Sequence, residues 1–188
     1  MLAAASCGSI LRNLPFLEML PTKSLSNAEL KLQAMKALNG QGEITDYGRR
    51  LFPLPIDTLF SHMLSVVVGR AEKETIVDLV SALSVSNKLY SMSRNQDALE
   101  DFNRWNPKGC DLITLVSIIR DYSCDGVVVD KELQFEARQL SKQIRHELGL
   151  PDLEVSSCIK RDEVLQQLVE KLPELVFVRR EKKKRSIG

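Results

Sequence analysis

The sequence has few of the residues that most often build catalytic or metal centres. Its 188 residues include two histidines, one tryptophan and four cysteines. The cysteines are widely separated, and no pair has the spacing of a metal site or a redox motif. We therefore expect no metal ligands and four reduced thiols, as in a cytosolic protein: Cys7, Cys110, Cys124 and Cys158.

Further absences exclude other classes of function. No apolar run approaches the ~18 residues that a membrane helix needs, and the N-terminus lacks the basic start of a secretory signal. No GxxxxGK(S/T) loop is present to bind the phosphates of ATP, and neither histidine lies in a nucleophile constellation. The sequence thus predicts a cytoplasmic chain with no membrane contact and no catalytic residues or cofactor site of its own.

Charge is balanced over most of the chain and concentrated at its end. Lys and Arg number 26 against 25 Asp and Glu, which gives a formal net charge of +1. Residues 179–185 (RREKKKR) hold six basic side chains and one acidic one, so subtracting their +5 leaves −4 for the rest. Overall charge therefore does not predict nucleic-acid binding, but the charge distribution leaves that function open.

Hydrophobic periodicity and turn signals predict a mainly α fold. Ser26 and Glu29 have the spacing of a capping box, Thr45 and Asp57 stand where N-caps belong, and Pro53 ends a short helix. We expect helices from Ser26 to about residue 38, over 45–52, from 58 and from 70 onward, near 96–105, 111–121 and 130–148, and at 162–172.

Extended segments are expected to be few and short. Residues 43–44 have the pattern of a short strand, and 175–178 (LVFV) predict another. Residues 127–129 (VVV) are either a strand or the buried entry to the next helix. The order of elements over 26–70 is typical of a small winged-helix unit, which the later helices follow as a bundle.

Four segments also carry a family pattern. The first reads Leu38, Gly42, Ile44-Thr45, Gly48-Arg49 and Leu54-Pro55-Ile56-Asp57. The others are 109–122 (GCDLITLVSIIRDY), 130–148 and 162–180 (DEVLQQLVEKLPELVFVRR). In this order and spacing they resemble the region that follows the motor domains of DEAH-box RNA helicases, in particular the HrpB-like bacterial branch.

The resemblance implies four parts. They are a connector from the motor region at 1–25, a winged helix at 26–70, a ratchet-like helical bundle at 71–150, and a helix and strand entering a truncated oligonucleotide-binding barrel, with the basic tail, at 151–188. The apolar stretch 10–20 is expected to pack within the connector.

The resemblance also implies an ATP-driven RNA helicase as the parent protein. ATP and magnesium would be bound by its motor domains, because this chain has no DEAH sequence. The implied partners are the motor domains of the same polypeptide and single-stranded RNA or, as a second choice, DNA. Two other hypotheses remain open, a stand-alone winged-helix DNA-binding regulator and a helical protein–protein adaptor.

The helix expected at 130–148 carries a basic stripe. At about 100° per residue, four basic side chains fall within an arc of roughly 60°: Lys131, Arg138, Lys142 and Arg145. Five apolar residues fall on the opposite side: Leu133, Ala137, Leu140, Ile144 and Leu148. The stripe is expected either to face outward and grip a phosphate backbone or to be a solvated face paired with Glu132 and Glu136.

Other basic residues have a functional and a structural interpretation. Arg49 and Arg50, with the capping Asp57, are expected to brace the winged helix against a motor domain. Arg179 and Arg180 begin the tail, which either binds RNA or is a solubilising end.

Trp105 and His62 can likewise be interpreted as functional or as structural residues. Trp105 offers a possible platform for a base, but its helical spacing from Leu99 and Phe102 favours a place in the core. His62 is expected to be structural, because it lies in a helix rich in Leu, Met and Val.

Overall fold

The computed structural model describes residues 1–173, apart from 86–87, 94, 107–108, 123 and 157, and it is mainly α as predicted. In chain order its helices are α1 (Leu2–Ser6), α2 (Thr22–Ala34), α3 (Asp46–Leu51), α4 (Thr58–Val66), α5 (Arg70–Val85), α6 (Gln96–Trp105), α7 (Asp111–Ile119), α8 (Lys131–Glu147) and α9 (Arg161–Lys171). The strands are β1 (Tyr90–Met92) and β2 (Val127–Val129), and short 3-10 turns cover Leu11–Asn13 and Leu153–Val155.

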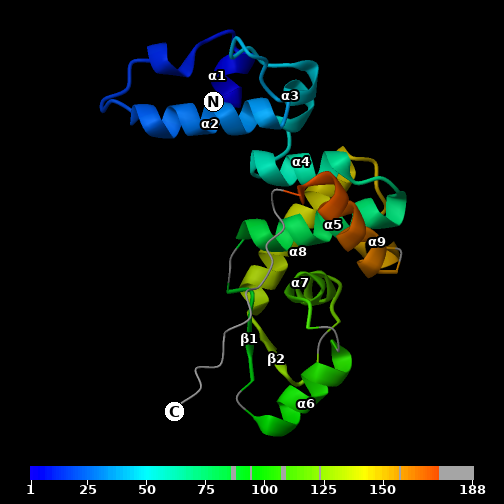
Figure 1. The fold of residues 1–188 in the computed structure, drawn as a ribbon. Coiled ribbons are helices and arrows are strands. Elements are labelled where there is room, and N and C mark those ends of the chain that lie inside the picture. The colour runs from blue at the N-terminus through cyan, green and yellow to red at the C-terminus, as the bar shows by residue number, and fades with distance from the viewer. Residues whose placement is uncertain (86–87, 94, 107–108, 123, 157, 174–188) are drawn as a thin grey trace, which may run out of the picture.

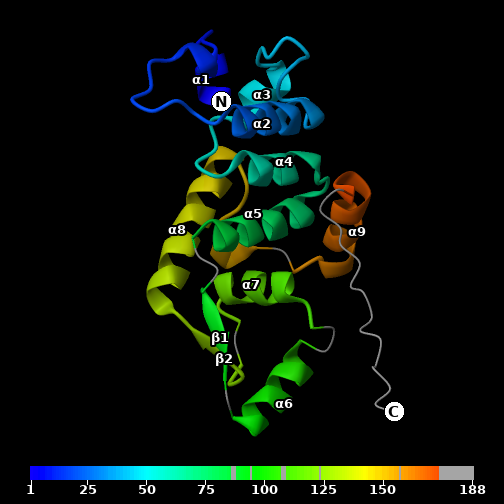
Figure 2. The same ribbon diagram turned by 60° about the vertical axis from the view of Figure 1, so that its left-hand side comes forward.

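These elements are stacked in three tiers along the molecule (Figures 1 and 2). Helices α1, α2 and α3 form one end, α4, α5, α7, α8 and α9 form the middle, and the β1–β2 hairpin with α6 forms the other end. Three clusters of buried apolar side chains follow the same order. No helix of the described residues is long and apolar enough to cross a membrane.

The first tier depends on a close backbone approach. Thr45 caps α3 as predicted, because its hydroxyl oxygen accepts a hydrogen bond from the Gly48 N–H at 3.0 Å. A Cβ on Gly48 would lie 2.3 Å from the Ala37 carbonyl oxygen, so only glycine fits there. The strand predicted at 43–44 is reduced to one bridge, between Leu38 and Ile44.

The start of α2 differs from the prediction. The helix begins at Thr22, before Ser26, so Ser26 and Glu29 do not form a capping box. Both side chains instead bind the Arg12 guanidinium, whose NH2 lies 3.3 Å from Ser26 Oγ and 2.8 Å from Glu29 Oε2. A charge-assisted bond to Arg12 is stronger than a neutral cap bond, and it ties the preceding turn to α2.

The middle tier is built around α5. This helix packs against α8 and α7 and also touches α4 and α9. Every residue from Glu74 to Ala82 is buried, which a helix achieves only when neighbours cover all its sides. Asp57 caps α4 as predicted, because its Oδ1 accepts a hydrogen bond from the Leu59 N–H at 2.8 Å.

The third tier settles the alternative at 127–129 in favour of a strand. β2 pairs with β1 in antiparallel register, with Tyr90 opposite Val129. Strand β1 was not predicted, because its three residues give too short a pattern for a strand signal. Gly126 lets the hairpin approach α6, since a Cβ there would lie 2.3 Å from the Ala98 carbonyl oxygen.

The connector at 10–20 is not packed as expected. Phe16 is half-exposed, and Leu17 and Met19 are fully exposed. Apart from the 3-10 turn at Leu11–Asn13, the stretch has no regular structure, and the described helices do not cover these three side chains. The strand predicted at 175–178 lies outside the described residues.

Candidate nucleic-acid interface

The basic stripe lies on α8, whose start is fixed by a side-chain cap. Asp130 Oδ1 accepts hydrogen bonds from the N–H groups of Glu132 and Leu133, both at 3.1 Å. The helix then buries a face that includes polar residues: Gln134, Ala137, Ser141, Ile144 and Arg145. The buried face thus lies closer to the basic stripe than the predicted apolar face does. Leu148, which was expected on the buried side, is 41% exposed.

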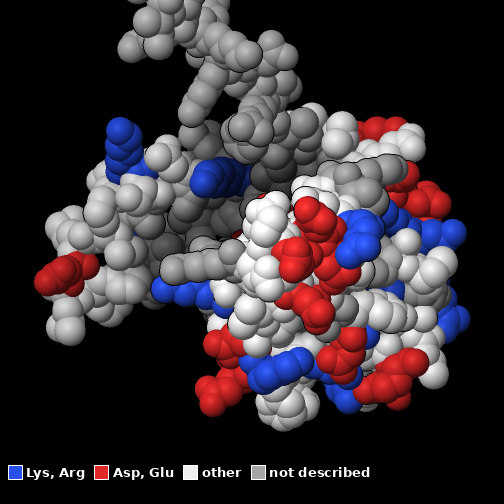
Figure 3. Space-filling model, turned by 90° about the horizontal axis from the view of Figure 1, so that it is seen from below, with Lys and Arg blue, Asp and Glu red and all other residues white. Residues whose placement is uncertain are grey.

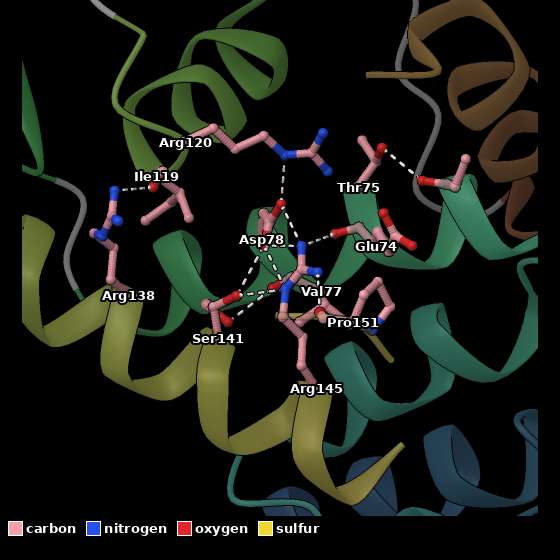
Figure 4. Close-up of polar contacts among 12 residues, drawn as sticks. Glu74, Thr75, Val77, Asp78, Ile119, Arg120, Arg138, Ser141, Arg145 and Pro151 are labelled. Atoms are coloured by element: carbon pink, nitrogen blue, oxygen red, sulfur yellow. Dashed lines mark hydrogen bonds and ion pairs between the residues drawn. The ribbon is translucent and has the colours of Figure 1, made fainter. Parts of the chain in front are cut away.

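Arg145 contradicts the prediction of an outward-facing stripe. Its side chain is only 1% exposed and points from α8 toward α5 (Figure 4). Its NH2 lies 2.8 and 2.9 Å from the two carboxylate oxygens of Asp78, and its NH1 donates to the Pro151 carbonyl oxygen at 2.9 Å. The physical reason is Asp78, whose buried charge requires a cation partner.

Asp78 is the centre of a buried polar cluster that joins three helices. Besides Arg145, its carboxylate accepts hydrogen bonds from Arg120 Nε on the α7 side at 2.7 Å and from Ser141 Oγ at 2.8 Å (Figure 4). Its own side chain is fully buried. The cluster fixes α8 and the end of α7 against α5, and it cannot reach a ligand in solvent.

Arg138 lies two stripe positions before Arg145 and is partly buried, with 23% of its side chain exposed. Its NH1 donates to the Ile119 carbonyl oxygen at 2.9 Å (Figure 4). The same NH1 pairs with Asp121 Oδ2 at 2.7 Å. Its NH2 lies 3.8 Å from Glu154 Oε1. One edge of the guanidinium is therefore held by the end of α7, and the other edge faces Glu154 and solvent.

Lys142 and Lys131 complete the stripe with different surroundings. Lys142 is exposed, and its Nζ lies 3.1 Å from the same Glu154 oxygen that faces Arg138. Lys131 Nζ donates to Gln134 Oε1 at 3.0 Å near the start of α8. The prediction that Glu132 and Glu136 pair with the stripe is not supported, because among the described residues Asp121 and Glu154 take that place. The stripe thus divides into one buried residue, two that share an acidic partner, and one at the helix start.

A groove opens beside Arg138. It has a volume of about 690 Å³ and lies between the end of α7 and the segment that connects α8 to α9. Glu154 stands in this groove on the 3-10 turn at 153–155. A hydrogen bond from its own backbone N–H, followed by the Lys142 ammonium, lowers the pKa of Glu154, so the carboxylate stays ionised at neutral pH.

The remaining predicted residues lie away from the groove. Arg49 and Arg50 are exposed on α3 and make no ion pair with the described residues, although the Arg50 guanidinium lies 5.9 Å from the Tyr47 ring centre. Among the described residues, the Asp57 side chain bonds the start of α4 as its cap. Arg179 and Arg180 lie outside the described residues, so their predicted role stays a prediction.

The two ring side chains have the structural roles that were expected. Tyr47 Oη lies 2.6 Å from His62 Nδ1, a bond that joins α3 to α4. Trp105 packs beside Phe102 against the buried cluster of the third tier, with ring centres 5.9 Å apart. His62 and Trp105 are both partly buried, and the contacts that these rings make are within the protein.

Several residues of the site were missed by sequence reasoning. Asp78 gave the one usable signal, since an acid inside the apolar run from Ile76 to Val80 needs a buried cation. Arg120 and Glu154 gave none, because their roles arise from segments far apart in sequence.

The end of the molecule formed by α6 and the hairpin has a different surface. Figure 3 shows acidic side chains gathered near the middle of this face, with basic ones among and around them. Among the described residues, no group of His, Cys, Asp and Glu is arranged to hold a metal ion. No protein-family model matches this sequence.

The groove beside α8, with Arg138 in its wall and Lys142 close to its Glu154, is the best candidate for contact with an anionic ligand.

Proposed function

We propose that this chain is the accessory region of an HrpB-like DEAH-box ATP-dependent RNA helicase. In this role it braces the motor domains and contacts single-stranded RNA as the motor steps. ATP and magnesium belong to the motor domains of the parent protein, in the cytoplasm, and the chain alone is not expected to hydrolyse ATP. Residues 26–70 would form the winged helix of this region and 71–150 its ratchet-like bundle.

The observation that carries the RNA-binding part is the pair Arg138 and Lys142. They stand one turn apart on α8, and both face the same carboxylate oxygen of Glu154, which lines the groove together with Arg138. The helix is anchored behind them through Arg145. A rigid helix that presents two cations at a groove edge is suited to bind a phosphate backbone, which is recognised by positioned Arg and Lys.

The bracing part is supported by the first tier. Helix α3 spans only Asp46–Leu51, about 9 Å at 1.5 Å per residue, and prolines follow it. It is too short to read the major groove as a recognition helix, which disfavours a stand-alone DNA-binding regulator. The exposed Leu17 and Met19 of the connector supply apolar surface for a neighbouring domain instead.

Titration of a fluorescent single-stranded RNA at low salt tests the RNA-binding part. We expect binding that the Arg138→Glu/Lys142→Glu double change weakens about tenfold or more, because it replaces two phosphate partners with repulsive charges. The matched control is Arg104→Glu/Lys160→Glu, which reverses two exposed, ion-paired cations elsewhere. No binding by the unaltered protein, or equal losses in both double variants, would contradict the proposal.

The gene that encodes the chain tests the helicase part. We expect the reading frame upstream of Met1 to encode a phosphate-binding loop and a DEAH sequence within the preceding ~500 residues, the length of two motor domains with linkers. An upstream region without these motifs would remove the motor from the proposal and leave the RNA-binding part to stand on the titration.

A further inference from the structure

Glu154 is placed as an anion on two cations. One of its carboxylate oxygens, Oε1, lies 3.1 Å from Lys142 Nζ and 3.8 Å from Arg138 NH2, and the side chain is 55% exposed. The carboxylate therefore occupies the position that any anion recognised by both side chains would take.

The backbone under Glu154 holds it there. Leu153, its neighbour on the same 3-10 turn, is buried, and the Pro151 carbonyl oxygen accepts a hydrogen bond from Arg145 in the central cluster. The segment is thus fastened immediately before Glu154, which holds the start of the turn, and with it the carboxylate, close to the two cations.

The fit of Glu154 to Arg138 is incomplete. A separation of 3.8 Å exceeds hydrogen-bond distance, so the NH2 edge of Arg138 makes no hydrogen bond to this carboxylate. The NH1 edge is already used by Ile119 and Asp121. A phosphate has more acceptor oxygens than a carboxylate reaching from one side, and it would satisfy both Arg138 NH2 and Lys142 Nζ.

An aromatic ring stands in the same groove. Tyr122 lines it and is 59% exposed. Its backbone N–H donates to the Ser117 carbonyl oxygen at 2.8 Å, which closes the end of α7. The preceding Asp121 has a φ of 61°, and its carboxylate accepts hydrogen bonds from Gln134 and Arg138, at 2.9 and 2.7 Å.

The backbone next to Tyr122 is held in a disfavoured conformation at Asp121. A non-glycine residue in the left-handed region is disfavoured, and here the bonds to α8 hold Asp121 in it. The result is an aromatic ring presented from a fixed backbone beside Arg138, the arrangement that supports a base stacked next to its phosphate.

From these contacts we infer that Glu154 occupies, in the free protein, the place of a backbone phosphate of single-stranded nucleic acid, and that the adjoining base stacks on Tyr122. The inference rests on the proposed RNA-binding function and names its binding site. Glu154 acts as a competing anion that the strand displaces, so the binding of one nucleotide costs the two ion pairs that Glu154 makes with Lys142 and Arg138.

Two pairs of variants test this with the full chain and a fluorescent single-stranded RNA. Glu154→Gln is expected to bind about three- to tenfold more tightly, because the competing charge is removed. Its control is Glu163→Gln, which removes an equally exposed acid paired with Lys160 at 3.8 Å and should leave the affinity unchanged.

The second pair concerns the ring. Tyr122→Ala is expected to weaken binding about tenfold, whereas Tyr122→Phe keeps the stacking surface and should bind as the unaltered chain does. Melting curves followed by circular dichroism confirm that all four variants are folded before the affinities are compared.

The outcomes separate this inference from the proposed function. If the unaltered chain binds RNA but Glu154→Gln behaves like Glu163→Gln, or Tyr122→Ala behaves like Tyr122→Phe, the inference is overturned and the function stands. If neither the unaltered chain nor Glu154→Gln binds RNA at low salt, both fail.

Discussion

Two arginines of the basic stripe on α8 have different surroundings. Arg138 and Arg145 are seven residues apart, which places them about 20° apart around the helix and about 10 Å along it. Arg145 is buried against Asp78, whereas Arg138 keeps one guanidinium edge toward a groove. Helical periodicity therefore fixes the direction of a side chain but not whether a neighbour covers it.

The difference lies in the elements that face each arginine. Arg145 meets the middle of α5, where Asp78 has no access to water and needs a partner. Arg138 meets the end of α7, where the chain turns away and leaves open space. The buried arginine holds the helix in place, and in our proposal the exposed one uses that rigidity to bind a ligand.

The largest expected effect is the loss of the buried arginine. Arg145→Met removes the bidentate partner of Asp78 and leaves a poorly compensated buried carboxylate, so we expect unfolding to become easier by about 3–5 kcal/mol. Urea denaturation followed by circular dichroism measures this. A loss no greater than that of Arg138→Met would mean that the two arginines do not differ as described.

A smaller effect is expected from the serine that supports the cluster. Ser141→Ala removes the hydroxyl that donates to Asp78 and accepts from Arg145 Nε at 3.2 Å, so we expect a loss of about 1–3 kcal/mol. Ser84→Ala is the matched control, because Ser84 is exposed and its hydroxyl, among the described residues, bonds only the Val80 carbonyl oxygen. The control should change stability by about 0.5 kcal/mol or less, and equal losses in both variants would argue against a special cluster.

The partly exposed arginine, Arg138, is expected to matter less for stability than Arg145 and more for RNA binding. Arg138→Gln should cost about 1 kcal/mol of stability or less, because its partners Asp121 and Glu154 are exposed to solvent. The same change should weaken RNA binding about tenfold. Denaturation and RNA titration of one preparation measure both, and a large stability loss with unchanged affinity would remove Arg138 from the interface.

The smallest effect is expected at the start of α8. Lys131 bonds only Gln134 among the described residues and lies about 10 Å along the helix from Arg138. Lys131→Gln should therefore change RNA affinity less than about twofold and stability by about 0.5 kcal/mol or less. An effect as large as that of Arg138→Gln would restore the longer stripe that the sequence predicted.

Local signals predicted most of the helices. Helix α6 spans the predicted 96–105 because Asn95 caps it, and the caps at Thr45 and Asp57 stand where the sequence placed them. The capping box predicted at Ser26 is absent because α2 begins one turn earlier, at Thr22, and Arg12 from a separate segment binds the Ser26 and Glu29 side chains. Cap signals in the sequence thus predicted helix starts correctly where the capping side chain bonds residues near it in the chain.

The site was predicted only in part for the same reason. The predicted helix is present, and Lys131 and Lys142 are exposed as expected. Arg138 is partly buried, and Arg145 is fully buried because Asp78 lies on another helix. Glu154 and Tyr122 could not be placed beside Arg138 without the fold, since they follow different helices. Hydrophobic periodicity within a helix does not show which side chains of distant segments lie beside it.

The salt dependence of RNA binding tests the central claim most directly. For a single strand, each phosphate contact contributes about −0.7 to the slope of log affinity against log salt concentration. Between about 50 and 200 mM salt, we predict that Arg138→Gln/Lys142→Gln makes this slope about 1.4 shallower than in the unaltered chain, the value for two lost contacts. An unchanged slope would contradict a phosphate-binding role for these two residues.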